Sequence, residues 1–115
     1  MTVVTVTIKK SGNLVYEPSN KVRRGQPVRF ELDLLDGPLW AKVHPPACLV
    51  ATNPVTLDRT SAAPPIYEDP VSESAAFMTY AFTVEVPPVP EKPHLGGEAE
   101  TKNGNLDVTT DPPEL

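Results

Sequence analysis

Proline constrains the fold of this chain more than any other residue, because fifteen of its 115 residues are prolines. That share is more than twice the usual one. A proline inside a helix removes a backbone hydrogen bond and clashes with the preceding turn, and a proline inside a central strand interrupts the ladder. The prolines therefore predict short strands joined by long, stiff connections, one of which is a polyproline-like stretch over residues 87–93.

Between the prolines, apolar residues alternate with other residues in the period-two pattern of half-buried strands. Residues 2–8 alternate Val and Ile with Thr, residues 28–33 alternate apolar with charged side chains, and residues 76–86 form the longest alternating run. No stretch has the period of a long helix. The pattern predicts an all-β domain, a two-sheet β-sandwich of about seven strands with long Pro-rich connections.

Capping residues, turn residues and the chain length lead to four further predictions. Asp69 is a suitable cap for one helical turn over residues 70–76. Residues 102–105, Lys-Asn-Gly-Asn, are typical of a tight turn before a closing strand. At this length the chain is one domain, which we expect to span residues 1–110. Residues 111–115 are expected to be a frayed tail.

Three stretches resemble the cupredoxin family. Residues 16–30 contain an aromatic-x-Pro corner followed by Val-x-x-Gly-x-x-Val-x-Phe, which is similar to the entry motif of that family. The Tyr80-x-Phe82 alternation and the stretch over residues 104–108 resemble its last two strands. Immunoglobulin-like domains share much of this pattern. The resemblance implies a Greek-key β-sandwich of cupredoxin-like type.

The residues that bind copper in cupredoxins are missing at the corresponding positions. The resemblance implies a first His near Leu39 or Trp40, a Cys at Val84, a second His at Pro87 and a Met near Lys102. A blue-copper site requires two imidazoles and a thiolate in a trigonal plane. We therefore expect a metal-free sandwich with no cofactor, acting as a non-enzymatic binding or structural module.

A small metal-binding or redox protein is the alternative, with Cys48, His44 and His94 as its ligands. His44 and Cys48 are four residues apart, but Pro45 and Pro46 exclude the helix that would place them on one face. A loop could still bring them together with His94. A cysteine between apolar residues is more often a small buried hydrophobe.

No motif in the sequence predicts an enzyme. The chain lacks a Gly-x-Ser-x-Gly elbow and a Gly-rich phosphate loop. Neighbouring carboxylates occur at residues 33 and 36, 68 and 69, and 98 and 100, in turn-like polar sequence that is typical of a solvated surface.

Charge is distributed unevenly along the chain and suggests a protein partner. Residues 1–30 contain six basic residues and one acid, whereas residues 31–115 contain four basic residues and fourteen acids, and the total is −5. The excess of acid argues against nucleic acid as a partner, while the asymmetry permits head-to-tail attraction between copies. We expect self-association or docking to another protein through the first strand, residues 2–8, if it lies at a sheet edge. The candidate interface residues are Trp40, as an aromatic anchor, with Lys9, Lys10, Arg23 and Arg24.

The sequence contains neither a long apolar run nor a leader-like segment, so we expect no membrane partner. The single cysteine cannot form an internal disulfide. These features favour the cytoplasm as the location of the chain.

Overall fold

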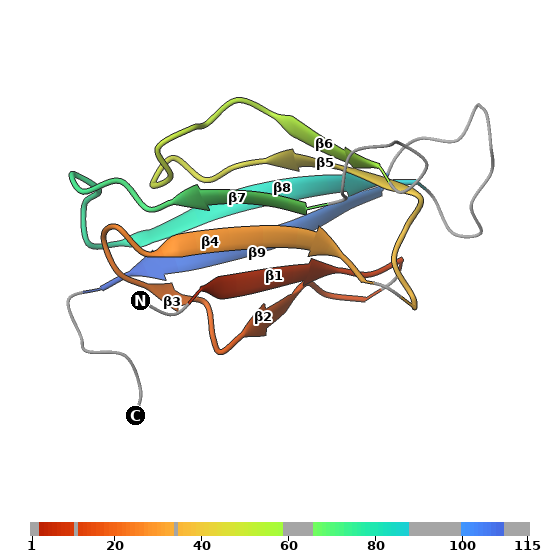
Figure 1. Ribbon diagram of the computed structural model, residues 1–115, viewed down its shortest axis with the longest axis horizontal. Coiled ribbons are helices and arrows are strands. Elements are labelled where there is room, and N and C mark those ends of the chain that lie inside the picture. Colours follow the sequence, from red (N-terminus) through yellow and green to blue (C-terminus); the bar gives the residue numbers. More distant parts are fainter. Residues whose placement is uncertain (1–2, 11, 34, 59–65, 88–99, 110–115) are drawn as a thin grey trace.

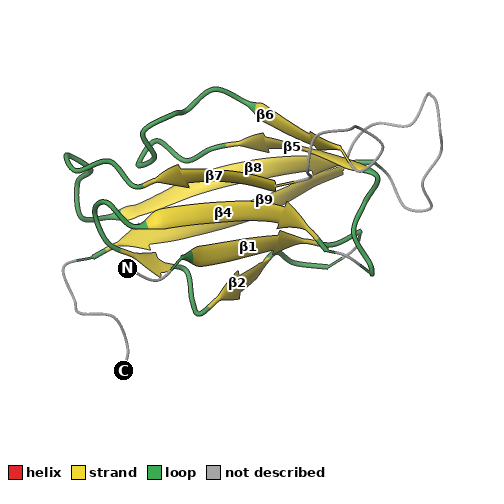
Figure 2. Ribbon diagram, in the orientation of Figure 1, coloured by secondary structure: helices red, strands yellow, loops and turns green. Residues whose placement is uncertain are grey.

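The chain folds into two β-sheets packed face to face (Figures 1 and 2). The computed structural model describes residues 3–10, 12–33, 35–58, 66–87 and 100–109, which form nine strands and no helix. The all-β prediction is confirmed. The strands are β1 (Val4–Ile8), β2 (Val15–Glu17), β3 (Lys21–Val22), β4 (Pro27–Leu32), β5 (Trp40–His44), β6 (Val55–Asp58), β7 (Ile66–Pro70), β8 (Thr79–Val86) and β9 (Glu100–Val108).

One sheet has the order β2-β1-β4-β7 and the other β3-β9-β8-β5-β6. Strand β1 pairs in parallel with β4, with Val4 opposite Val28 and Ile8 opposite Leu32. Strand β3 pairs in parallel with β9, and the remaining pairs are antiparallel. The sandwich has two ends (Figure 1). We call the end where β4 and β8 begin the turn end, and the end where β1 and β4 finish the loop end.

Alternating side chains of both sheets meet in one apolar core. Phe30 is completely buried near its centre, where its ring lies 5.6 Å edge-on from that of Phe82 and 6.2 Å stacked against that of Tyr67. Val28 and Leu32 are buried beside it, as the alternation in residues 28–33 predicts. Both sheets therefore contribute to a single core. The expected tail, residues 111–115, lies outside the described residues.

Two of the nine strands are absent from the sequence-based prediction of about seven. Strand β7 occupies Ile66–Pro70, next to the stretch expected to form a helical turn, and residues 73 and 74 form a plain turn. The Asp69 carboxylate caps no helix and instead accepts a hydrogen bond from the Ala51 amide at 2.8 Å. Strand β7 has no buried apolar alternation of its own, so only its pairing with β4 defines it. Strand β3 is two residues long and is defined by β9 in the same way.

The prediction of a tight turn at residues 102–105 is wrong, because these residues lie inside β9. Gly104 is buried opposite Phe82, and a Cβ atom added there would meet Phe82 Cζ at 2.5 Å, the Tyr16 hydroxyl at 2.6 Å and Leu14 Cδ1 at 2.8 Å. Asn105 donates its backbone N–H to that hydroxyl at 3.0 Å. The glycine therefore serves close packing rather than a turn.

Strand β8 begins at Thr79, three residues later than the alternating run predicts. Tyr80, near its start, donates its hydroxyl to the Ala76 carbonyl at 2.9 Å. The backbone bends at residues 77 and 78, just before the strand, so Met78 leaves the core face that the alternating run predicts for it. Phe77 and Met78 are both about half exposed. The described residues include no helix that could cross a membrane.

Candidate interaction surfaces

The positions that correspond to copper ligands in cupredoxins are occupied by apolar packing and by a lysine. Val84 is completely buried and lies opposite Val43 on β5, and Pro87 is buried after the end of β8. Lys102 lies directly across from Val84 in the β8–β9 pair, and its ammonium group donates a hydrogen bond to the Gly12 carbonyl at 2.7 Å. These side chains offer no imidazole, thiolate or thioether to a metal.

The alternative ligands Cys48 and His44 lie in different environments. Cys48 is buried in the core, and burial raises the pKa of its thiol to about 11, an effect partly offset by a backbone hydrogen bond. The thiol is therefore protonated at neutral pH, whereas a metal ligand must be a thiolate. His44 faces outward from β5, where its Nε2 lies 2.9 Å from a Glu85 carboxylate oxygen. Within the described ranges no three His, Cys, Asp or Glu residues form a metal-binding group. His94 lies outside those ranges.

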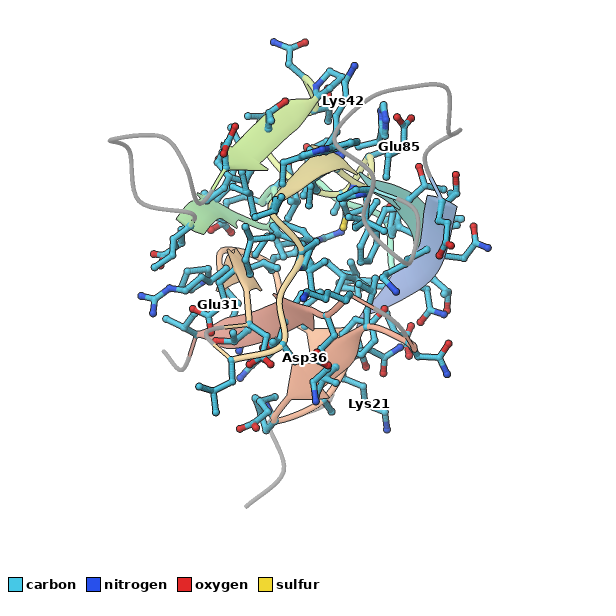
Figure 3. All side chains as sticks on the ribbon, turned by 90° about the vertical axis from the view of Figure 1, so that its right-hand side faces the viewer. Lys21, Glu31, Asp36, Lys42 and Glu85 are labelled. Carbon is cyan, nitrogen blue, oxygen red and sulfur yellow. The ribbon has the colours of Figure 1, made fainter. Side chains whose placement is uncertain are left out.

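The His44–Glu85 pair is the closest approach to an acid–base arrangement in the described part of the chain. Lys42 lies opposite Glu85 in the β5–β8 pair, and Figure 3 shows both on the outer face of the five-stranded sheet. Both members of the His44–Glu85 pair are partly solvent-exposed, so water screens their interaction. A pair on an open sheet face holds no substrate and excludes no water, which favours a surface contact over catalysis.

The interface residues predicted from the sequence lie at opposite ends of the sandwich. Lys9 and Lys10 follow β1 at the loop end, and Trp40 begins β5 at the same end, half-buried on the outer face opposite Asp58. Arg23 and Arg24 precede β4 at the turn end. The parallel pairing of β1 with β4 makes this separation unavoidable, because residues after β1 and residues before β4 then lie at opposite ends.

The first strand lies inside its sheet, between β2 and β4. Its backbone groups are therefore used on both sides, and it offers no edge for a second chain. The expectation of a contact through an exposed first strand is wrong. In the described part of the chain, the edge strands of the two sheets are β2, β7, β3 and β6.

A different surface forms at the turn end, and we define the turn-end surface as Arg23, Arg24, Phe77 and Met78. Phe77 and Met78 are 50% and 53% exposed. The guanidinium carbon of Arg24 lies 4.1 Å from the centroid of the Phe77 ring, at the distance of a cation–π contact. Arg24 also donates from Nε to the Ala75 carbonyl at 2.8 Å. These two contacts fix the arginine over the ring.

The β3–β4 turn that carries the arginines is itself held rigidly. Gly25 has a φ of +81°, which favours glycine, and its N–H donates to the Val71 carbonyl at 2.8 Å. The buried Gln26 side chain accepts a hydrogen bond from the Arg23 amide at 2.9 Å. The turn is thus joined to the segment that leads to Phe77, and the surface is preformed.

The charge of the turn-end surface is not neutralised by ion pairs. Among the described residues, no carboxylate forms an ion pair with Arg23 or Arg24. The Glu73 carboxylate lies close to Gly25 in the same turn region, but it makes no ion pair with either arginine. Arg24 therefore lies beside an exposed apolar pair with no carboxylate in ion-pair contact among the described residues.

The sequence contained one signal for this surface. In the alternating run 76–86, Phe77 stands at an outward position that is otherwise occupied by Thr, Ala and Glu. A large aromatic residue on an outward position indicates either a bend or an interface.

Comparisons of the chain with family models, curated proteins and solved structures found no match.

Proposed function

We propose that this chain is a non-enzymatic binding module on a Greek-key, cupredoxin-like sandwich, which binds a protein partner through the turn-end surface. One observation carries the proposal. Phe77 and Met78 are half exposed next to each other, and Arg24 is stacked on the ring with no acidic partner among the described residues. Exposed Phe and Met side chains leave apolar surface in contact with water. A partner that buries this surface contributes favourable free energy to binding.

The composition of the surface supports a protein partner. Aromatic residues, Met and Arg are enriched in the cores of protein interfaces, and Arg and aromatic residues dominate their binding energy. A guanidinium stacked on a ring keeps its outer edge available for a bidentate carboxylate. Because both the turn and the arginine are held by hydrogen bonds within the chain, little conformational entropy is lost when a partner binds.

The arrangement of strands supports the Greek-key part of the proposal. The parallel pairs β1–β4 and β3–β9 mean that the chain passes repeatedly between the two sheets. The Tyr80 hydroxyl bonds to the backbone four residues earlier, at the start of β8. A tyrosine that bonds back in this manner is a hallmark of immunoglobulin-type sandwiches. With Val84 in place of a thiolate, we propose a scaffold without a metal or other cofactor.

We also propose that the partners of the chain are proteins rather than nucleic acids or membranes, and that the chain is located in the cytoplasm. The single thiol, Cys48, is buried and protonated, a state that suits a reducing compartment.

A photo-crosslinking amino acid in place of Met78 tests the proposed surface in cells that express the chain. We expect one discrete crosslinked product, because Met78 is half exposed and belongs to the surface. The yield should fall several-fold when Phe77→Asp is added, since a carboxylate then lies at the centre of the contact. Gel mobility and mass spectrometry of the product provide the measurement.

The matched control places the same crosslinker at Asn103, which is exposed on β9 and faces away from the core. A product that forms equally well at residues 78 and 103, or that is unaffected by Phe77→Asp, would contradict binding through the turn-end surface.

A further inference from the structure

The loop end of the sandwich carries an exposed apolar side chain between two acids. The segment from β4 to β5 passes from one sheet to the other, and Leu35 within it is 96% exposed. Asp33 and Asp36 lie on either side of Leu35. The Asp36 amide donates to the Asp33 carboxylate at 3.0 Å, and the Lys10 amide donates to the Asp36 carbonyl at 2.8 Å. We call Asp33, Leu35 and Asp36 the Leu35 knob, and Figure 3 views this end with Asp36 labelled.

The Leu35 knob and the turn-end surface are complementary in chemistry. One presents a leucine between two carboxylates, and the other presents a phenylalanine and a methionine beside two arginines. Leucine against Phe77 and Met78 buries apolar surface on both partners. An aspartate beside Arg24 would form a charge-assisted, bidentate pair with its guanidinium.

We propose that the partner of the turn-end surface is the Leu35 knob of a second copy of this chain. The inference rests on the proposed function and names its partner. The two elements lie at opposite ends of the parallel β1–β4 pair, so one chain cannot satisfy its own contact. The contact is heterologous, since each copy uses a different surface at each end. Contacts of this kind form rings if the rotation closes and linear filaments if it does not.

Other charges at the two ends modulate this contact. Lys9 and Lys10 follow β1 near the Leu35 knob, and Glu73 lies beside the turn that carries Arg23 and Arg24. Each is opposite in sign to the charges that the proposal uses at its own end. Because all these groups are near solvent, the association weakens as salt is added.

Two variants of the full chain separate a head-to-tail contact from every symmetric one. Phe77→Asp disables the turn-end surface and leaves the Leu35 knob intact, and Leu35→Asp does the reverse. Sedimentation velocity from micromolar to millimolar concentration should show association of the natural chain and a monomer for each variant. An equimolar mixture of the two variants should form a one-to-one dimer and nothing larger, because only one productive contact remains per pair.

Val15→Asp is the matched control, since it places the same carboxylate on an exposed apolar position of the edge strand β2, which belongs to neither surface. It should associate as the natural chain does. A natural chain that is monomeric throughout, a mixture that stays monomeric, or variants that associate like the control would overturn the head-to-tail contact. If Met78 then still crosslinks to a different protein, the proposed function stands and only its partner changes.

Discussion

Replacing Phe30 with alanine is expected to lower the free energy of unfolding by about 3–5 kcal/mol, the range for removing a buried aromatic ring. Phe30 is completely buried and contacts the rings of Phe82 and Tyr67, so the cavity is bordered by both sheets. A domain of this size has a total stability of roughly 5–15 kcal/mol. The variant should therefore unfold at a much lower urea concentration than the natural chain. Circular dichroism during a urea titration measures the difference.

Phe77→Ala provides the matched control, since the same substitution is made at a half-exposed ring. Its effect should stay near 1 kcal/mol, the order of the cation–π contact with Arg24 that it removes. Equal losses for Phe30→Ala and Phe77→Ala would contradict the core as described.

A valine at Gly104 should destabilise the chain by about 3 kcal/mol, at the upper end of the usual cost of overpacking. The added Cβ would lie within 3 Å of Phe82, Tyr16 and Leu14, so three side chains from two segments must move together. The hydrogen bond from the Asn105 amide to the Tyr16 hydroxyl would be strained as well. Urea unfolding of the purified variant measures the loss.

Asn103→Val is the control for that substitution, because Asn103 is exposed one position earlier in the same strand. A β-branched residue there fits a strand and should change stability by less than about 0.5 kcal/mol. If Gly104→Val were as stable as Asn103→Val, the close packing of Gly104 against Phe82 and Tyr16 would be contradicted.

The class of fold was predictable because it depends on local patterns. Val28, Phe30 and Leu32 alternate with charged residues, and that alternation alone assigns them to a buried face. Strand β7 was not predictable, since its residues carry no such alternation and are ordered by pairing with β4. The turn predicted around Gly104 is wrong for a related reason. The residues next to Gly104 in sequence resemble a turn, whereas its neighbours in space are Phe82 and Tyr16.

The candidate surface was predictable only in part. Their charge alone marks Arg23 and Arg24 as candidates, whereas the position of Arg24 against Phe77 depends on hydrogen bonds to residues 71 and 75, far along the chain. The sequence groups them with Lys9 and Lys10 only by their common charge. The parallel register of β1 and β4 places the two basic pairs at opposite ends, which no local pattern indicates.

Whether this scaffold binds proteins or carries out metal chemistry is decided most directly by native mass spectrometry of the chain purified from copper- and zinc-supplemented cells and then dialysed. We expect the mass of the chain alone or of its multiples, with no metal. The copper-ligand positions are occupied by Val84, Pro87 and Lys102, the Cys48 thiol is buried and protonated, and His44 faces outward. One equivalent of copper or zinc per chain, lost in both Cys48→Ser and His44→Gln, would contradict a metal-free binding module.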